Sequence, residues 1–212
     1  VPLNASGIEN ILGANKQSSA GLPVTASAAL SYPAIFRGIN IRAGTIGRLP
    51  LYVLKRSEGG KEKDEAHPAF RLLVDAPNPE QTSNAFKTLL EAHTILHGNG
   101  YALITRNSFG APVSLIPLDP EKVIPFKEDG RLGYSLLEDN KLTVELPNNI
   151  LHIKGLSYDG LTGLGLVDTL MDTIGLGLAA QKYQAIFFKN GAAPQTVIEL
   201  PGNLRNKEAV ER

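Results

Sequence analysis

The sequence contains no cysteine, which excludes disulfide bonds, zinc sites built on thiolates and cysteine nucleophiles. It also has no excess charge of either sign. Lysine plus arginine total 21, and aspartate plus glutamate total 21. Proteins that hold nucleic acid tightly through many phosphates usually carry a basic excess. The charge balance therefore disfavours tight, sequence-independent binding to DNA.

Long hydrophobic runs are missing as well, since no apolar stretch approaches the roughly 20 residues that span a bilayer. The first residues, VPLNASGIENILGANKQSSAG, lack the charged and then apolar layout of a signal peptide. Their Ser, Asn and Gly content predicts a flexible N-terminal arm over residues 1–24. At the other end, LPGNLRNKEAVER begins a helix and stops, which predicts either a chain truncated at its C-terminus or one of which only the first part is ordered.

The hydrophobic pattern predicts an α+β protein. One helix is expected over Pro33–Ile46 with Gly47 as C-cap, and a second over Asn84–His97 with Ser83 as N-cap and Gly98 as terminator. Six short strands follow, at 101–106, 113–118, 122–126, 133–137, 142–146 and 150–154. They do not alternate with helices, so we expect an antiparallel sheet or small barrel and not a parallel Rossmann sheet.

A single long helix is expected over Leu166–Lys189, with a length of about 36 Å. Apolar residues cover much of its circumference, which predicts packing on several sides. Gly175 and Gly177 lie inside it, and each costs about 1 kcal/mol relative to Ala. We expect this cost to be offset by close contact with another helix or a neighbouring subunit. The residues predicted to make these contacts are Gly175, Leu176, Gly177, Tyr183 and Phe187.

Two histidines, His93 and His97, lie four residues apart on one face of the second predicted helix, which is the spacing of a metal site. A zincin helix carries a glutamate base directly after the first histidine, and Thr94 stands there instead. Both histidines flank the apolar stripe, and His97 is placed to interact with free carbonyl groups at the helix end. We therefore predict that these histidines are structural and bind no metal.

A glycine-rich loop, GLSYDGLTGLGL, invites comparison with phosphate-binding loops. Its Gly155 and Gly160 have the spacing of a P-loop, but Leu161 replaces the required lysine. The Gly175-x-Gly177-x-x-Ala180 pattern matches a dinucleotide fingerprint, yet it falls in the middle of a helix with no preceding strand. No serine lies in a G-x-S-x-G elbow. The sequence thus predicts no catalytic residue, no cofactor and no enzyme activity.

Several stretches occur in the order of a known family. The most specific motifs among them are Pro77-Asn78-Pro79, Gly98-Asn99-Gly100-Tyr101, Leu118-Asp119-Pro120 and Phe188-Lys189-Asn190-Gly191. From about Leu22 to its end, the chain resembles the portal proteins of tailed bacteriophages, of the siphophage type. One departure is Gly163-Leu164-Gly165-Leu166, where the family more often has Gly-x-Ser-Pro.

The resemblance implies a structural protein of the virion, assembled in the cytoplasm of the host bacterium. About twelve subunits would form a ring at one capsid vertex. Double-stranded DNA would pass through its channel during packaging and ejection. The implied partners are further copies of the chain, the large terminase subunit, head–tail adaptor proteins, and capsid and scaffold proteins. No membrane is implied.

The resemblance also divides the chain into a wing domain (25–160), a stem helix with its preceding loop (161–191) and the start of a clip region (192–212). DNA contact would be weak and independent of sequence, with Lys182 and Lys189 of the stem helix as candidate channel residues. A solvated, helix-stabilising role for both lysines stays open. Two alternative functions also stay open: a phosphate-binding enzyme using the loop 155–165, and another assembly or adhesion module.

Overall fold

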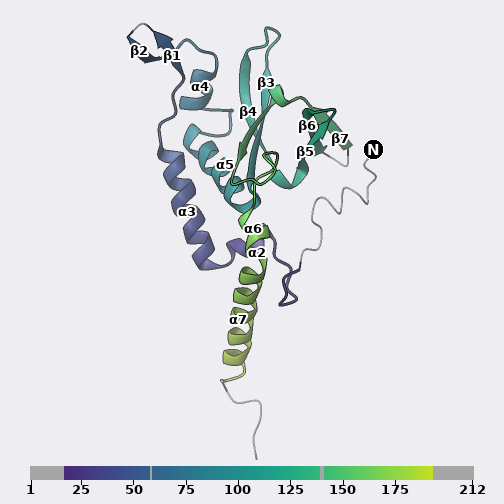
Figure 1. Cartoon of the computed structure of the whole chain (residues 1–212). Helices are drawn as coiled ribbons and strands as arrows, with labels where there is room; N and C mark the ends of the chain where they lie inside the picture. Colours follow the sequence, from purple (N-terminus) through teal and green to yellow (C-terminus); the bar gives the residue numbers. More distant parts are fainter. Residues whose placement is uncertain (1–16, 58, 139–140, 193–212) are drawn as a thin grey trace, which may run out of the picture. The chain divides into compact units, whose positions relative to one another are not determined.

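The computed structural model describes residues 17–57, 59–138 and 141–192 (Figure 1). The chain divides into two units, Val1–Leu178 and Ala179–Arg212, and each is described by itself. The first unit combines helices with antiparallel sheets, so the predicted α+β class is confirmed. No helix among the described residues is long and apolar enough to span a membrane.

Two long helices of the first unit, α3 (Pro33–Arg48) and α5 (Ser83–His97), pack against each other. Gly47 makes this approach possible, because a Cβ atom there would overlap the hydroxyl of Thr88 on α5. Gly47 is therefore a packing residue inside α3 and not the predicted C-cap. The helix ends one residue later, with Leu49 as C-cap in an extended conformation before Pro50.

The ends of α5 are fixed by local hydrogen bonds. Thr82 is the N-cap, and its hydroxyl accepts from the Ala85 N–H at 3.3 Å. The prediction of Ser83 as cap is wrong, because the Ser83 hydroxyl donates instead to the Leu73 carbonyl at 2.5 Å. Gly98 ends the helix in the left-handed region, with φ of 77°, so the predicted terminator is confirmed.

All six predicted strands form, and they are antiparallel as expected. In the part of the chain that the structure describes, however, they make two separate sheets instead of one sheet or barrel. The first sheet has the order β4-β3-β8, with β3 at Asn99–Arg106, β4 at Pro112–Leu118 and β8 at Ile150–Lys154. The second has the order β5-β6-β7, with β5 at Val123–Glu128, β6 at Arg131–Glu138 and β7 at Lys141–Glu145.

Shorter elements complete the first unit. They are α2 (Ala26–Leu30), the hairpin of β1 (Leu54–Ser57) and β2 (Gly60–Lys63), α4 (Ala69–Val74), and the 3-10 turns η1 (Pro120–Lys122) and η2 (Pro147–Asn149).

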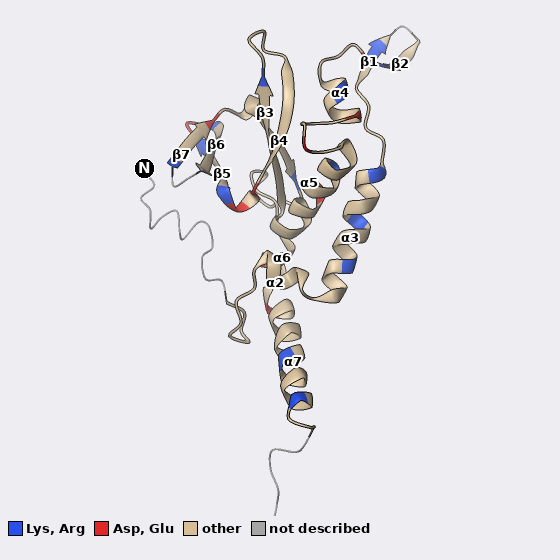
Figure 2. Cartoon of the chain, turned by 180° about the vertical axis from the view of Figure 1, so that it is seen from behind, with Lys and Arg blue, Asp and Glu red and all other residues tan. Residues whose placement is uncertain are grey.

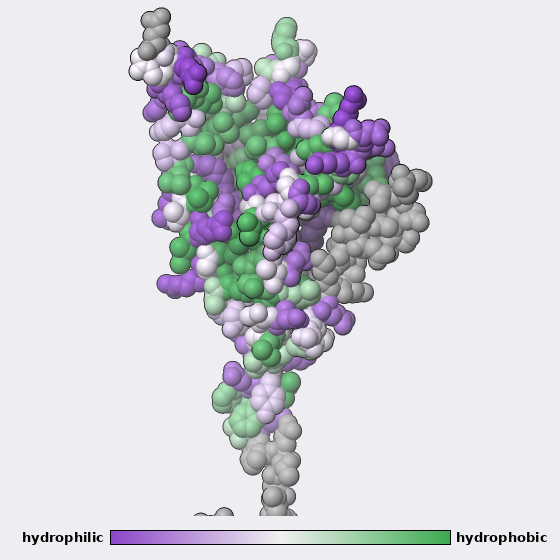
Figure 3. Space-filling view, in the orientation of Figure 1, coloured by the Kyte–Doolittle hydropathy of each residue, from purple (hydrophilic) through white to green (hydrophobic). Residues whose placement is uncertain are grey.

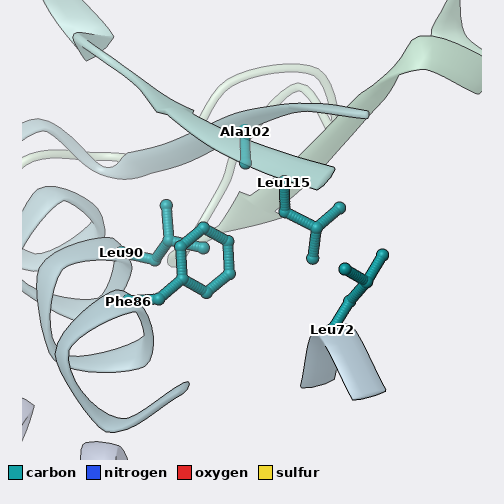
Figure 4. Packing of buried hydrophobic residues seen from close by; sticks show 5 residues of the cluster. All are labelled: Leu72, Phe86, Leu90, Ala102 and Leu115. Carbon is teal, nitrogen blue, oxygen red and sulfur yellow. The ribbon is translucent and has the colours of Figure 1, made fainter. Parts of the chain in front are cut away.

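Strand β3 lies between two hydrophobic cores, because its side chains alternate between the faces of its sheet. Ala102 and Ile104 face the first core, which α4, α5 and β4 complete. Its buried members are Leu72, Phe86, Leu90, Ala102 and Leu115 (Figure 4). Tyr101 and Leu103 face the second core, shared with the other sheet. The two sheets are thus held together by the side chains that β3, β5, β6 and β8 bury in this second core.

The segment 17–24 packs onto the start of the long C-terminal helix. Ser18 and Val24 are buried, and Val24 shares a third core with Ala29 and Ile174. The Ser19 N–H donates to the carboxylate of Asp172 at 2.7 Å, which lowers the pKa of that carboxyl. The prediction of a flexible arm is therefore wrong for residues 17–24, and its remaining residues, 1–16, lie outside the described part.

The predicted continuous helix over 166–189 is interrupted. It consists of α6 (Leu166–Thr169) and α7 (Met171–Lys189), with Leu170 between them at φ −111° and ψ 20°. The hydroxyl of Thr169 donates to the Gly165 carbonyl at 2.7 Å, a bond of the kind that bends helices. The predicted clip region, 192–212, lies outside the described residues beyond its first position.

Candidate functional site

The glycine-rich loop 155–165 lies against the C-terminal end of α5. The Gly155 N–H donates to the carbonyl of Gly98 at 2.8 Å. A Cβ atom on Gly163 would overlap that same carbonyl oxygen, and one on Gly165 would lie 2.6 Å from the Leu96 oxygen. The glycines therefore allow two stretches of backbone to touch, which explains their clustering without a ligand.

Several backbone donors of this loop are already engaged. The carboxylate of Asp159 accepts from the N–H groups of Leu161 (2.7 Å) and Thr162 (2.8 Å), and these bonds hold its pKa well below the usual range. The Gly160 N–H donates to Ser157, and the Gly163 N–H to Asn99. A phosphate site needs such donors free, and the C-terminal end of a helix carries partial negative charge. This geometry opposes the alternative of a phosphate-binding loop.

Asn99 is the centre of a polar network that sequence reasoning missed. Its side-chain oxygen accepts from the Gly163 N–H at 2.8 Å and lies 3.0 Å from Nε2 of His152. Because an amide oxygen only accepts, Nε2 is the donor in that pair. Nδ1 of His152 then accepts from the hydroxyl of Tyr134 at 3.1 Å. The network joins both sheets to the glycine-rich loop through a neutral imidazole.

This network makes stability depend on pH. Burial, and then Lys154, lower the pKa of His152 to about 4, against 6.5 for the free side chain. The folded state prefers the neutral ring of His152. The contribution of this residue to the free energy of unfolding is therefore complete above about pH 6.5 and is lost as the pH falls toward 4. We expect the urea midpoint of the wild type to drop between pH 7 and pH 5 by more than that of His152→Gln. The matched control is His67→Gln, at an exposed position, which should keep the pH profile of the wild type. Equally shallow profiles of urea midpoint against pH in the wild type and His152→Gln would contradict the assignment of this loss to His152.

The two helix histidines are placed as a core-flanking pair. The rings of His93 and His97 lie 6.3 Å apart, centroid to centroid, and are nearly perpendicular. Burial, followed by the effect of His97, lowers the pKa of His93. Nδ1 of His97 lies 3.9 Å from a carboxylate oxygen of Glu121. No group of three or more metal-ligating side chains occurs among the described residues, and the absence of a metal here stays a prediction that elemental analysis can test.

The two helical glycines of α7 contact the N-terminal part of the first unit. Gly175 is buried, and a Cβ atom there would overlap the side chain of Ser18 and lie 3.5 Å from Cγ2 of Val24. A Cβ on Gly177 would lie 3.1 Å from the ring of Tyr32, the N-cap of α3. The neighbour of Gly175 is therefore the segment 17–24, which folds into a turn before α2, and not a second helix. Leu176 is 67% exposed, and its predicted contact remains a proposal.

The described part of the second unit, residues 179–192, holds the remaining candidates. Tyr183 is 66% exposed, and its ring stacks on that of Phe187 with centroids 6.4 Å apart. Lys182 and Lys189 are exposed and lie seven residues apart on α7. Their spacing places them roughly on one face of the helix, about 10 Å apart along its axis.

Comparison with known proteins gives a consistent result. A family model described as phage portal protein matches residues 33–212. The portal protein of Enterobacteria phage HK97 is 29% identical over 169 residues, which cover 78% of this chain and 40% of that protein.

Two solved structures share the fold. The first is an HK97-family phage portal protein from Corynebacterium diphtheriae, with a TM-score of 0.58, 18% identity and coverage of 90% of this chain and 59% of that one. The second comes from the neck of a native gene transfer agent particle computed with C12 symmetry, with a TM-score of 0.66, 19% identity and coverage of 96% and 56%. The chain thus spans less than two thirds of the length of these proteins.

Proposed function

The chain belongs to the phage portal protein family, and from that premise we propose that it forms part of a ring-shaped channel for double-stranded DNA at a capsid vertex. The observation that carries the proposal is the family match over residues 33–212. The fold likeness to an HK97-family portal protein over 90% of the chain supports it. Residues 25–160 then correspond to the wing, and residues 161–191, which include α7 (Met171–Lys189), to the stem helix with its preceding loop.

Ring assembly is the central part of this proposal. A similar structure belongs to a particle neck computed with C12 symmetry, which supports self-association in a closed ring. The implied partners are the terminase, the head–tail adaptor proteins, and the capsid and scaffold proteins. We place the protein in the virion, assembled in the host cytoplasm, with a structural role and no chemistry of its own.

The proposal is tested by electron microscopy of the purified protein in negative stain. We expect closed rings with a central hole. Monomers at every concentration would overturn ring formation and favour an adhesion-type module. Thermal stabilisation by a nucleotide would favour the phosphate-binding alternative, which the occupied donors of the loop 155–165 oppose.

DNA should be guided through the channel and not held. With 21 basic and 21 acidic residues the chain has no net charge, and each phosphate contact would add salt-dependent affinity that slows translocation. Lys182 and Lys189 are the proposed channel cations. Their affinity for DNA should fall with salt at a shallow slope of about one or two phosphates per subunit.

Replacing both lysines together, Lys182→Ala with Lys189→Ala, is expected to reduce packaging yield or speed in assembled rings. The same rings should still form, since both side chains are exposed. Lys127→Ala, an exposed lysine on β5, is the matched control. Unchanged packaging by intact double-variant rings would leave the two lysines only their favourable interaction with the helix C-terminus.

A further inference from the structure

Two sides of the first unit carry opposite charge. Residues 33–57, which form α3 and β1, contain five basic and no acidic residues. Residues 123–146, which contain β5, β6 and β7, hold five acidic and three basic residues. In both views of the molecule, α3 and the β5-β6-β7 sheet lie on opposite sides of the layer made by α5, β3 and β4 (Figures 1 and 2).

The basic side is an exposed helix face with an apolar centre. Arg37, Ile41 and Arg48 follow the spacing i, i+4, i+11, which places them on one side of α3. Ile41 is 59% exposed, whereas Ile39 and Ala43, on the other side of the helix, are buried. Figure 3 shows hydrophobic and hydrophilic side chains mixed along this side of the molecule. We call the side formed by Arg37, Ile41 and Arg48 the α3 face.

The acidic side also has an apolar surface, on strand β7. Leu142 and Val144 of β7 and Leu146 directly after it alternate with polar residues along extended backbone and so point the same way, and Val144 is 66% exposed. Strand β7 pairs with β6 on one side only and leaves its other edge open within the described sheet. An exposed apolar edge strand is a ready site for association with another chain. We call this surface, formed by the three residues, the β7 face.

We infer that the α3 face of one copy binds the β7 face of the next copy around a ring. The inference rests on the proposed ring, because cyclic assembly beyond a dimer joins two different patches of the same chain head to tail. Opposite net charge favours contact between the two sides and opposes the contact of either side with itself. Both faces also place an exposed aliphatic side chain at their centre, Ile41 and Val144, which supplies apolar area to bury.

The absence of cysteine from the sequence makes the inference directly testable by disulfide formation. Ile41→Cys and Val144→Cys should each remain uncrosslinked alone under mild oxidation and should form covalent dimers when mixed. The double variant should give a ladder of covalent oligomers. Phe109→Cys mixed with Ile41→Cys is the control, because Phe109 is 92% exposed at the β3–β4 turn and belongs to neither face.

Charge reversal on the α3 face is the second test of the inference. Arg37→Glu with Arg48→Glu, in the Ile41→Cys background, should lower the mixed crosslink yield about fivefold or more. Arg42 is avoided, because it pairs with Glu91 of α5 at 2.7 Å.

The outcomes separate this inference from the ring itself. Rings without a mixed Ile41→Cys and Val144→Cys crosslink, or with Ile41→Cys crosslinking alone as strongly as the mixture, would overturn the inference and leave the proposed function standing. A mixed yield unmoved by charge reversal would overturn the electrostatic part. Monomers under all conditions would overturn both.

Discussion

Gly163→Ala is expected to lower the free energy of unfolding by about 3 kcal/mol or more. The added methyl group would overlap the Gly98 carbonyl oxygen and lie 2.9 Å from the Gly155 nitrogen. These are backbone atoms, one at the C-cap of α5 and one at the start of the glycine-rich loop, and they cannot rotate away as a side chain can. The loop would have to lift from the helix end, and the bonds of Asn99 to the Gly163 N–H and carbonyl would be lost with it.

The measurement is a urea unfolding curve followed by circular dichroism. Gly38→Ala is the matched control, since it lies in α3 and a methyl group there meets no atom within 4 Å. That control should be neutral or stabilising by up to about 1 kcal/mol, because Ala is the better helix former. A Gly163→Ala midpoint as high as that of the wild type would show that the loop is not in contact with the end of α5.

Local patterns predicted much of this fold because they report local causes. The alternation of strand residues located all six strands, and Gly98 marked the end of α5 because positive φ favours glycine. Local patterns do not report contacts between segments that are far apart in the sequence. Thr82 and Ser83 are both good caps, and only the Leu73 carbonyl, which occupies the Ser83 hydroxyl, decides between them. Gly47 before Leu49 and Pro50 has the pattern of a helix end, yet α5 requires it as a helical packing residue.

The polar network and the sheet division share the same cause. Tyr101 pairs with His152 across β3 and β8, and Tyr134 reaches that histidine from the second sheet. Both facts depend on strand register and sheet packing, which short sequence windows do not contain. The sequence shows Gly155, Gly163 and Gly165 as a cluster, but it does not show that they pack against the end of α5. A phosphate and the end of a helix both require bare backbone, so the glycine pattern alone could not separate them.

The segment 17–24 is expected to detach from α7 when Gly175 is enlarged. Gly175→Leu would drive its side chain into Ser18, which is buried with 4% of its surface exposed. Hydrogen exchange of residues 17–24 should become faster by more than tenfold, while strands β3 and β8 keep their protection. Gly177→Leu is the control, because its neighbour is the ring of Tyr32, which can rotate aside. Equal exchange in Gly175→Leu and the wild type would contradict the contact.

A double-mutant cycle assigns that effect to one pair of residues. In the wild-type background, Gly175→Ala combines a gain of about 1 kcal/mol in helix propensity with an overlap that costs about 1–3 kcal/mol. Ser18→Gly removes the side chain that a new Cβ would meet, together with its hydroxyl bond to the Leu22 carbonyl. In that background Gly175→Ala should be neutral or stabilising, so the two changes should couple by at least about 1 kcal/mol. Additive effects would mean that Gly175 is required for a reason other than Ser18, and a neighbouring subunit against α7 would then be the partner to test.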